Sequence, residues 1–312
     1  MIMMDFKQKF EPKGNRVIHG AGQEGDLFKY ADDFKDYWNT MGNKRPVLFM
    51  TYIQLKYVNA AWFELIKKQI KDFPNVLLQI GLSMSDTHSG EPEKHYEQEV
   101  PKGKYNQNII EFCKGIRDLR VPCFVRPGYE FNGLSWYGYQ PKTFVRAWKY
   151  LIEKVRESNV ENIAWVWHYS PEGESNYMDY YPGDDCVDWW ATTIFSSKHL
   201  KDNEQFIKDA EKHRKPVMIA ESSARGIGTI QGKESWNKWF KPYFEWISNN
   251  PIVKSFCYIN WDWSTKQEIW KEWGDCIISH NELVKEKYLQ ELSKGIYINN
   301  MSMEEFLKLV HH

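Results

Sequence analysis

Short runs of β-branched and aromatic residues recur along the chain, each followed by a loop and then by a segment whose apolar residues have helical spacing. Eight such runs lie at residues 15–20, 45–52, 75–82, 121–128, 162–169, 187–195, 215–222 and 253–260. Between them are amphipathic segments, such as AAWFELIKKQIKDF at 60–73, that are long enough to form helices covering one face of a sheet. The pattern predicts eight consecutive β-then-α units.

Eight such units fit a (β/α)8 barrel, the TIM barrel of the α/β class, in which each parallel strand needs a crossover helix before the next strand. The alternative is a doubly wound open sheet. The count of eight favours the barrel, and so does the absence of a Pro/Gly/Ser-rich linker along the 312 residues of the sequence. We therefore expect a single (β/α)8 domain over residues 1–312.

The charge balance and the aromatic content of the sequence limit the kinds of partner that we expect. The sequence has 41 Lys plus Arg against 42 Asp plus Glu, a formal net charge of -1. Nucleic-acid binding needs a clustered basic excess, so we expect no nucleic-acid partner. Aromatic content is high, with 15 Trp, 18 Tyr and 17 Phe. A core does not need so many indoles, and some of them are therefore expected to serve a function at the surface.

The sequence shows neither a targeting signal nor a cysteine pattern that indicates a metal site or disulfides. No apolar run reaches the roughly 18 residues of a membrane span, so no membrane partner is expected. The opening MIMMDFKQKF carries charges where a secretory signal would be apolar, which predicts no signal peptide. A cytoplasmic protein and a secreted one whose signal has been removed would read alike. The five cysteines are odd in number and form no CxxC pair, so neither a zinc site nor a disulfide framework is expected.

Two glutamates lie at the carboxyl ends of predicted strands, which is where the active sites of (β/α)8 barrels are found. Glu130 in RPGYEFNG follows the fourth run and Glu221 in PVMIAESS ends the seventh. The fourth and seventh strands lie on opposite sides of an eight-stranded barrel, so the two carboxylates are expected to face each other. Either glutamate alone could cap a helix or pair with an arginine. Together they match glycosidic cleavage, which needs one carboxyl to protonate the leaving oxygen and another to attack or to activate water.

Several segments, in the same order and over about half of the chain, resemble those of a known protein family. They are KGKYNQNI (102–109), VRPGYEFNGLSWYGY (125–139), IAWVWHYSP (163–171), YYPGDDCVDWW (180–190) and RKPVMIAES (214–222). They resemble the glycoside hydrolases of clan A, and among these most resemble glycoside hydrolase family 26. The resemblance implies a retaining enzyme without cofactor, with Glu130 as acid/base and Glu221 as nucleophile. It implies a β-linked polysaccharide as substrate, with β-mannan as first choice and mixed-linkage β-glucan or xylan as alternatives.

The sequence departs from the family pattern at two positions. The family commonly has His before the acid/base, where this chain has Tyr129, and many members have Tyr at the end of strand six, where Phe195 is the nearest match. Arg126 has the same strand parity as Glu130, so we expect its guanidinium to enter the site and pair with Glu221. A nearby cation favours the ionised carboxylate that a nucleophile requires.

The remaining candidates are residues that could bind sugar. Pyranose rings present flat C–H faces to an indole, while the polar tips of Trp and Tyr can bind hydroxyls. We expect Trp261 to be the floor of the subsite for the sugar that is cleaved. The full set of expected substrate-binding residues is Arg126, Tyr129, Asn132, Trp136, Trp167, His168, Phe195, Asn260, Trp261, Trp263 and His19.

Three other functions remain open at this point. GAGQEG after His19 places Gly20, Gly22 and Gly25 in a GxGxxG pattern, but the second run lacks the acidic residue that a dinucleotide site needs. We interpret it as a glycine-rich turn rather than as the site of a nicotinamide-dependent oxidoreductase. The polar loop at 83–104, with His88 and His95, is interpreted as solvated rather than metal-binding. A carbohydrate-binding homologue without turnover is the third alternative.

Overall fold

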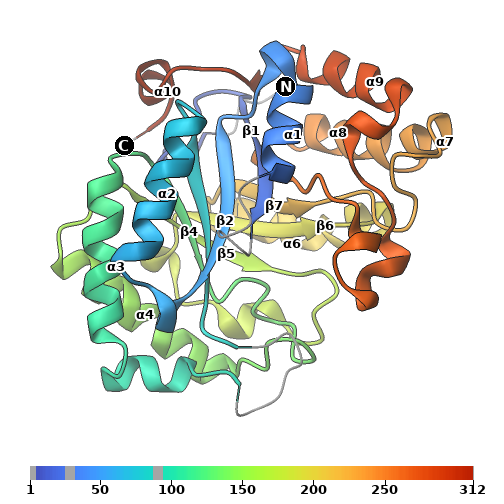
Figure 1. Ribbon diagram of the computed structural model, residues 1–312. Coiled ribbons are helices and arrows are strands. Elements are labelled where there is room, and N and C mark those ends of the chain that lie inside the picture. The colour runs from blue at the N-terminus through green and yellow to red at the C-terminus, as the bar shows by residue number, and fades with distance from the viewer. Residues whose placement is uncertain (1–4, 25–31, 87–93, 312) are drawn as a thin grey trace. The chain divides into compact units, whose positions relative to one another are not determined.

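The computed structural model describes residues 5–24, 32–86 and 94–311 (Figure 1). Each of the eight predicted runs overlaps a strand. The strands are β1 (Val17–Glu24), β2 (Leu48–Gln54), β3 (Leu77–Ser83), β4 (Cys123–Pro127), β5 (Ile163–Tyr169), β6 (Trp189–Ile194), β7 (Val217–Ser222), β8 (Val253–Tyr258) and β9 (Tyr297–Ile298). The ninth is two residues long and was not predicted.

The strands form one sheet in the order β2-β3-β4-β5-β6-β7-β8-β1-β9, and β2 also pairs with β1. This additional pairing closes strands one to eight into a ring, as in the predicted (β/α)8 barrel. The pairs β3 with β4, β4 with β5, β7 with β8, and β8 with β1 are parallel. β9 extends the sheet beside the start of β1.

Helices follow the strands as the amphipathic pattern predicts. They are α1 (Asp32–Thr40), α2 (Ala60–Asp72), α3 (Asn106–Leu119), α4 (Pro141–Glu157), α5 (Ser197–Asp202), α6 (Glu204–Lys212), α7 (Lys233–Ser235), α8 (Lys241–Asn249), α9 (Glu282–Leu292) and α10 (Met303–Leu309). The amphipathic segment at 234–250 does not form one regular α-helix: it includes a π-helical turn at Trp236–Phe240 between α7 and α8. Pro242 lies in the first turn of α8, where its missing N–H is tolerated.

The chain divides into two compact units, residues 1–50 with 192–312, and residues 51–191. In the second unit α2, α3 and α4 lie side by side (Figure 1). The apolar face of α4, with Phe144, Trp148 and Leu151, is buried. In the first unit the aromatic side chains of α8 and β8 pack together, as in the contact of Phe244 with Phe256. The expected single domain stays a prediction.

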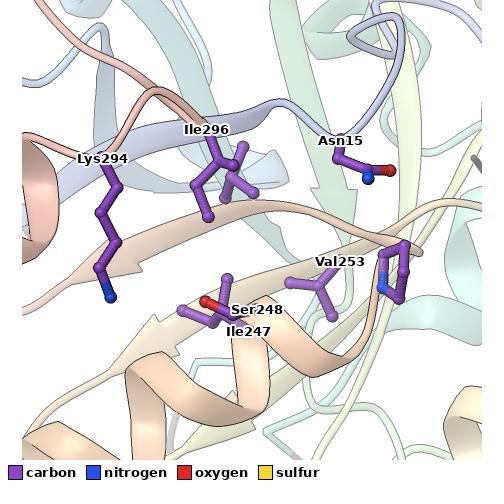
Figure 2. Close-up of a pocket in the computed structure, with 8 residues that line it drawn as sticks. Asn15, Ile247, Ser248, Val253, Lys294 and Ile296 are labelled. Atoms are coloured by element: carbon purple, nitrogen blue, oxygen red, sulfur yellow. The ribbon is translucent and has the colours of Figure 1, made fainter. Parts of the chain in front are cut away.

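The first unit has a cavity of about 220 Å³ at the start of β1 and β8 (Figure 2). Val17, Ile247, Val253 and Ile296 give it apolar walls, and Lys294 extends along one side. Because β1, β8 and β7 run parallel, this cavity is at the opposite end of the strands from Glu221. It is therefore not the candidate active site. Among the described residues, no helix is long and apolar enough to cross a membrane.

Candidate active site

Glu130 stands in the tight turn after β4, and its backbone is left-handed. Its φ is +51°, and that of Gly128 is +53°. For a residue other than glycine this conformation costs roughly 1–3 kcal/mol. Two backbone hydrogen bonds hold the turn: the N–H of Gly128 donates to the carbonyl of Leu82 at 2.8 Å, and that of Gly133 donates to the carbonyl of Glu130 at 3.0 Å. The Glu130 side chain is partly exposed, as a group that exchanges protons with water requires.

Arg126 and His168 form a buried pair on β4 and β5. Both side chains are fully buried, and an Nη atom of Arg126 donates to Nδ1 of His168 at 2.8 Å. Burial and the charge of Arg126 hold the pKa of His168 well below its usual range. The ring is therefore neutral, with its proton on Nε2. The expected ion pair between Arg126 and Glu221 involves the two units and stays a prediction.

The Tyr129 ring lies against this buried cation. The Arg126 guanidinium is 5.1 Å from the centre of the Tyr129 ring and 5.2 Å from that of Tyr52. The two rings meet edge to face at 5.2 Å. Gly81 pairs with Arg126 in the sheet, and a Cβ there would come within 2.5 Å of Tyr52. A glycine on β3 thus makes room for the aromatic layer that encloses Arg126.

Trp136 lies on the same loop as Glu130 and is partly exposed. A Cβ on Gly133 would lie 2.0 Å from the Trp136 ring, so the indole rests directly on the Gly133 backbone. Because Gly133 also closes the Glu130 turn, the position of the indole is linked to that of the carboxylate. This arrangement keeps Trp136 among the candidates for sugar stacking.

Asn132 and Trp167 have structural partners instead of a free surface. Asn132 Nδ2 donates to the carbonyl of Ser170 at 2.9 Å, and its Oδ1 accepts from the Ser170 N–H at 2.9 Å. The amide therefore joins the loops after β4 and β5. Trp167 is fully buried, stacks on Phe131 at 4.7 Å and donates from Nε1 to the carbonyl of Tyr180. The structure favours a positioning role for Asn132 and a packing role for Trp167.

Glu221 lies within β7 and is 5% exposed. Its neighbour Ser222 faces the helices, since the Ser222 hydroxyl lies 2.9 Å from that of Tyr243 on α8 and donates to the carbonyl of Cys257. Successive side chains of a strand point to opposite faces, so Glu221 projects from the face that α8 does not cover. A regular strand thus fixes the direction of this carboxylate.

The loop after β8 carries Trp261 and Trp263, which differ in burial. Trp263 is 1% exposed and donates from Nε1 to the Ser223 hydroxyl at 3.0 Å, two residues beyond Glu221. Trp261 is partly exposed and meets Trp263 edge to face at 5.0 Å. Phe195, at the end of β6, is buried 6.0 Å from Trp263. Trp263 is the buried centre of the group, and Trp261 presents surface.

Asn260 and His19 are also bonded within the protein. Asn260 Oδ1 accepts from the N–H of Ile278 at 2.8 Å, and its Nδ2 donates to Asp36 at 3.0 Å. The His19 ring nitrogens lie 2.8 Å from Asn299 Oδ1 and 2.6 Å from the Tyr37 hydroxyl, and burial lowers the pKa of His19 to about 3. Both side chains are thus bonded within the protein, and their expected role in sugar binding stays a prediction.

The glycines after His19 are not in a turn, which corrects that interpretation. Gly20 and Gly22 lie inside β1, and Gly25 lies outside the described residues. A Cβ on Gly20 would come within 2.5 Å of the Cys257 sulfur, and one on Gly22 within 2.5 Å of the Met50 carbonyl. These glycines allow β1 to approach β8 and β2 closely.

The candidate metal residues can be placed in part. His88 is outside the described residues, and Nδ1 of His95 lies 2.7 Å from the buried carboxylate of Glu97. No cluster of three or more metal-ligating side chains occurs within residues 5–24, 32–86 and 94–311.

The structure adds aromatic and cationic residues that the sequence reasoning missed. Trp270 and Trp273 join Trp263 at 5.4 and 4.6 Å, and the Arg225 guanidinium covers Trp273 at 4.7 Å. The signal was available, because WDWSTKQEIWKEW places four tryptophans in one short loop.

Comparison with known proteins gives the family. The model of glycosyl hydrolase family 26 matches residues 92–268, more than half of the chain. The β-1,3-xylanase TXYA of a Vibrio species is 28% identical, over 94% of this chain and 68% of its own length. A β-1,3-xylanase of an Alcaligenes species is 27% identical, over 76% of this chain and 54% of its own length, so the chain spans about half of that relative.

Solved structures share the fold. The family 26 β-mannanase BoMan26A of Bacteroides ovatus superimposes with a TM-score of 0.65 at 15% identity, covering 96% of this chain and 94% of that one. GH26C of a Muricauda species gives 0.66 at 15% identity, covering 98% and 91%. The fold is thus a (β/α)8 barrel, as the strand order indicates. The chain belongs to glycosyl hydrolase family 26 and is a glycoside hydrolase.

Proposed function

We propose that this chain hydrolyses β-1,3-linked xylan with retention of configuration, using Glu130 and Glu221. The choice of substrate rests on how much of this chain is similar to each relative. The match to the Vibrio β-1,3-xylanase runs over 94% of this chain, whereas that to a Thermothelomyces mannan endo-1,4-β-mannosidase runs over 44%. The choice of sugar depends on the loops after all the strands, so a match along the whole chain carries more weight.

In the first step, the Glu221 carboxylate attacks the anomeric carbon while Glu130 donates its proton to the glycosidic oxygen. The bond from the anomeric carbon to that oxygen breaks, and a glycosyl ester forms on Glu221. In the second step, Glu130 takes a proton from water as the water oxygen attacks the same carbon and Glu221 leaves. Two inversions give net retention.

The placement of each glutamate supports these roles. A buried carboxylate within a strand has a fixed direction, as a nucleophile needs, while the partly exposed Glu130 can exchange its proton with water between steps. A retaining pair requires the carboxyl groups about 5 to 5.5 Å apart, and an inverting pair roughly 6.5 to 9.5 Å. A crystal structure with the two carboxyl groups more than about 10 Å apart would refute the assignment.

Substrate choice is tested by reducing-sugar release from β-1,3-xylan, β-1,4-xylan, β-mannan and mixed-linkage β-glucan, with Glu221→Gln as the inactive control. We expect β-1,3-xylan to be hydrolysed fastest. Faster release from β-mannan would overturn the proposed substrate and leave the glycosidase assignment in place.

β-Mannan, the first choice from the sequence, is the second candidate. It is favoured by the mannan endo-1,4-β-mannosidases among the relatives and by the β-mannanase structures that share the fold. A protein that only binds glycan would be retarded in gels containing a polysaccharide and would release no sugar from any of them.

A further inference from the structure

The loop after β8, residues 259–281, holds an aromatic group with a buried centre and a partly exposed rim. Trp263 is the centre, and Trp261, Trp270 and Trp273 surround it with ring centres 5.0, 5.4 and 4.6 Å away. All three outer indoles are partly exposed. One buried aromatic centre is enough to keep a loop ordered. The three partly exposed indoles around it are not needed for that purpose.

Ile269 extends the apolar rim beside Trp270 and is 73% exposed. Apolar side chains that gather on a surface, unlike single scattered ones, usually mark a binding site. We call Trp261, Ile269 and Trp270 the tryptophan shelf. It begins at the residue expected to support the cleaved sugar and continues away from it along Glu268–Trp273.

We propose that the tryptophan shelf is a second sugar-binding site, in which Trp270 and Ile269 bind the sugar next to the one on Trp261. The ring centres of Trp261 and Trp270 are 6.4 Å apart, so neighbouring sugars of one chain can each meet an indole. Stacking of C–H faces on indoles needs no particular hydroxyl pattern, which suits a surface that holds a sugar other than the one being cleaved.

The inclination of the two indoles bears on the linkage of the bound chain. Their planes differ by 43°. Successive rings of a β-1,4-linked mannan lie close to one plane, because the chain is a flat ribbon, whereas a β-1,3-linked xylan winds and turns each ring relative to the last. Two inclined faces can both be covered by a chain that turns, while a flat ribbon stacked on one face leaves the other. The shelf therefore favours a winding β-1,3-linked xylan over a flat β-mannan.

Contacts from outside the loop hold the shelf in place. The Lys266 ammonium lies 4.5 Å from the Trp261 ring and pairs with Asp33 at 2.6 Å. At the other end, Arg225 covers Trp273, and the N–H of Gly226 donates to the Trp273 carbonyl at 2.9 Å. The rim is thus fixed before any sugar binds, which reduces the entropy lost on binding.

This inference rests on the proposed function, and its test separates the two. Trp270→Ala should lower kcat/KM on β-1,3-xylan about tenfold, through a higher KM, because one stacked sugar is lost. An aryl β-xyloside, whose single sugar reaches only Trp261, should be cleaved as before. Trp270→Phe should restore most of the loss, and Ile269→Ser should show a smaller loss without affecting the fold. Trp246→Ala, on a partly exposed tryptophan of α8, is the matched control and should behave as the parent.

Equal activity of Trp270→Ala and the parent on β-1,3-xylan would overturn the shelf, as would an equal loss on the polymer and the aryl xyloside. This preference is tested in gels containing soluble β-1,3-xylan or β-1,4-mannan, with Glu221→Gln as the background. Retardation should be stronger in β-1,3-xylan and should disappear with Trp270→Ala; equal retardation in both gels would overturn the preference for a winding chain. If the parent hydrolyses no β-1,3-xylan, the proposed function fails, while the gels still decide on the shelf.

Discussion

The two glutamates near the carboxyl ends of β4 and β7 are held in different ways. Glu221 lies inside a strand and is buried, and the alternation of side chains along β7 sets its direction. Glu130 lies beyond its strand, in a turn with left-handed backbone at Gly128 and Glu130, and is partly exposed. A nucleophile must be aimed, whereas an acid/base must be aimed and also reach water. The comparison teaches that backbone geometry and exposure separate two residues of the same type.

The largest effect is expected for Glu221→Gln. Loss of the proposed nucleophile should lower kcat by about 10⁴-fold or more on every substrate, including those with activated leaving groups. Glu130→Gln should lose as much on xylan, but far less in the first step on an aryl glycoside that needs no proton. The comparison is made by pre-steady-state release of the aryl group. Equal losses for both variants would remove the distinction between the two roles.

Trp261 and Trp263 should respond differently to truncation. Trp263→Ala removes a buried centre and should cost roughly 3–5 kcal/mol of unfolding free energy together with activity. Trp261→Ala should lower turnover strongly with most of the stability kept, because the residue is partly exposed. Urea unfolding and initial rates measure both. If Trp261→Ala loses most of its stability, Trp261 is packing and the sugar platform moves to Trp136, which is also partly exposed.

The turn that carries Glu130 can be tested with a matched glycine pair. Gly128 and Gly42 both have left-handed φ, at +53° and +55°. A Cβ on Gly128 would come within 2.6 Å of Phe144, while nothing lies within 4 Å of one on Gly42. Gly42→Ala should cost about 1 kcal/mol from the backbone alone, and Gly128→Ala more, with a loss of kcat. Equal stabilities and unchanged rates would show that the turn does not position Glu130.

Buried histidines give each unit a dependence on pH. Burial lowers the pKa of His19 to about 3, and burial with the Arg126 charge lowers that of His168. Both are neutral when folded, but the unfolded chain takes up their protons near pH 6.5. The free energy of unfolding should therefore fall as pH drops below about 6.5, by up to about 1.4 kcal/mol per pH unit for each histidine, and for His19 down to about pH 3.

The variant His19→Gln tests this smallest effect. Its unfolding free energy at pH 7 should be lower than that of the parent, because the two hydrogen bonds of the His19 ring are lost. Its decline between pH 6.5 and 5 should be shallower, by about 1–2 kcal/mol in total. Urea unfolding at both pH values measures the slope. A slope equal to that of the parent would contradict the origin assigned to it.

Strands β1 to β8 could be predicted from sequence because each is a short apolar run between turn residues, and each of the eight predicted runs overlaps one of them. The π-helical turn could not, because an extra residue in a helix leaves the apolar pattern nearly unchanged. Glu130 and Glu221 could be named as candidates because they lie at, or just beyond, the carboxyl ends of buried strands. The hydrogen-bond partners of the other polar candidates could not be predicted from sequence. The amides of Asn132 and Asn260, for example, bond to backbone groups supplied by distant loops.

Strand parity separates His19 from the glycines of β1, although its expected role in sugar binding stays a prediction. His19 alternates with Gly20 and Gly22, and these glycines are the positions where β1 approaches its neighbours. Parity therefore places His19 on the other face, where the Tyr37 hydroxyl of α1 contacts it. Trp167 is different, because its burial depends on Phe131 and Tyr180 from other loops.

The measurement that tests the central claim most directly is rescue of Glu130→Ala by azide, with an aryl β-xyloside as substrate. The variant should form the glycosyl ester on Glu221 and then stall, because no base activates water. Azide needs no base, so it should restore turnover and release a β-glycosyl azide. An α-glycosyl azide from Glu130→Ala, or rescue confined to Glu221→Ala, would contradict the account and reverse the two roles.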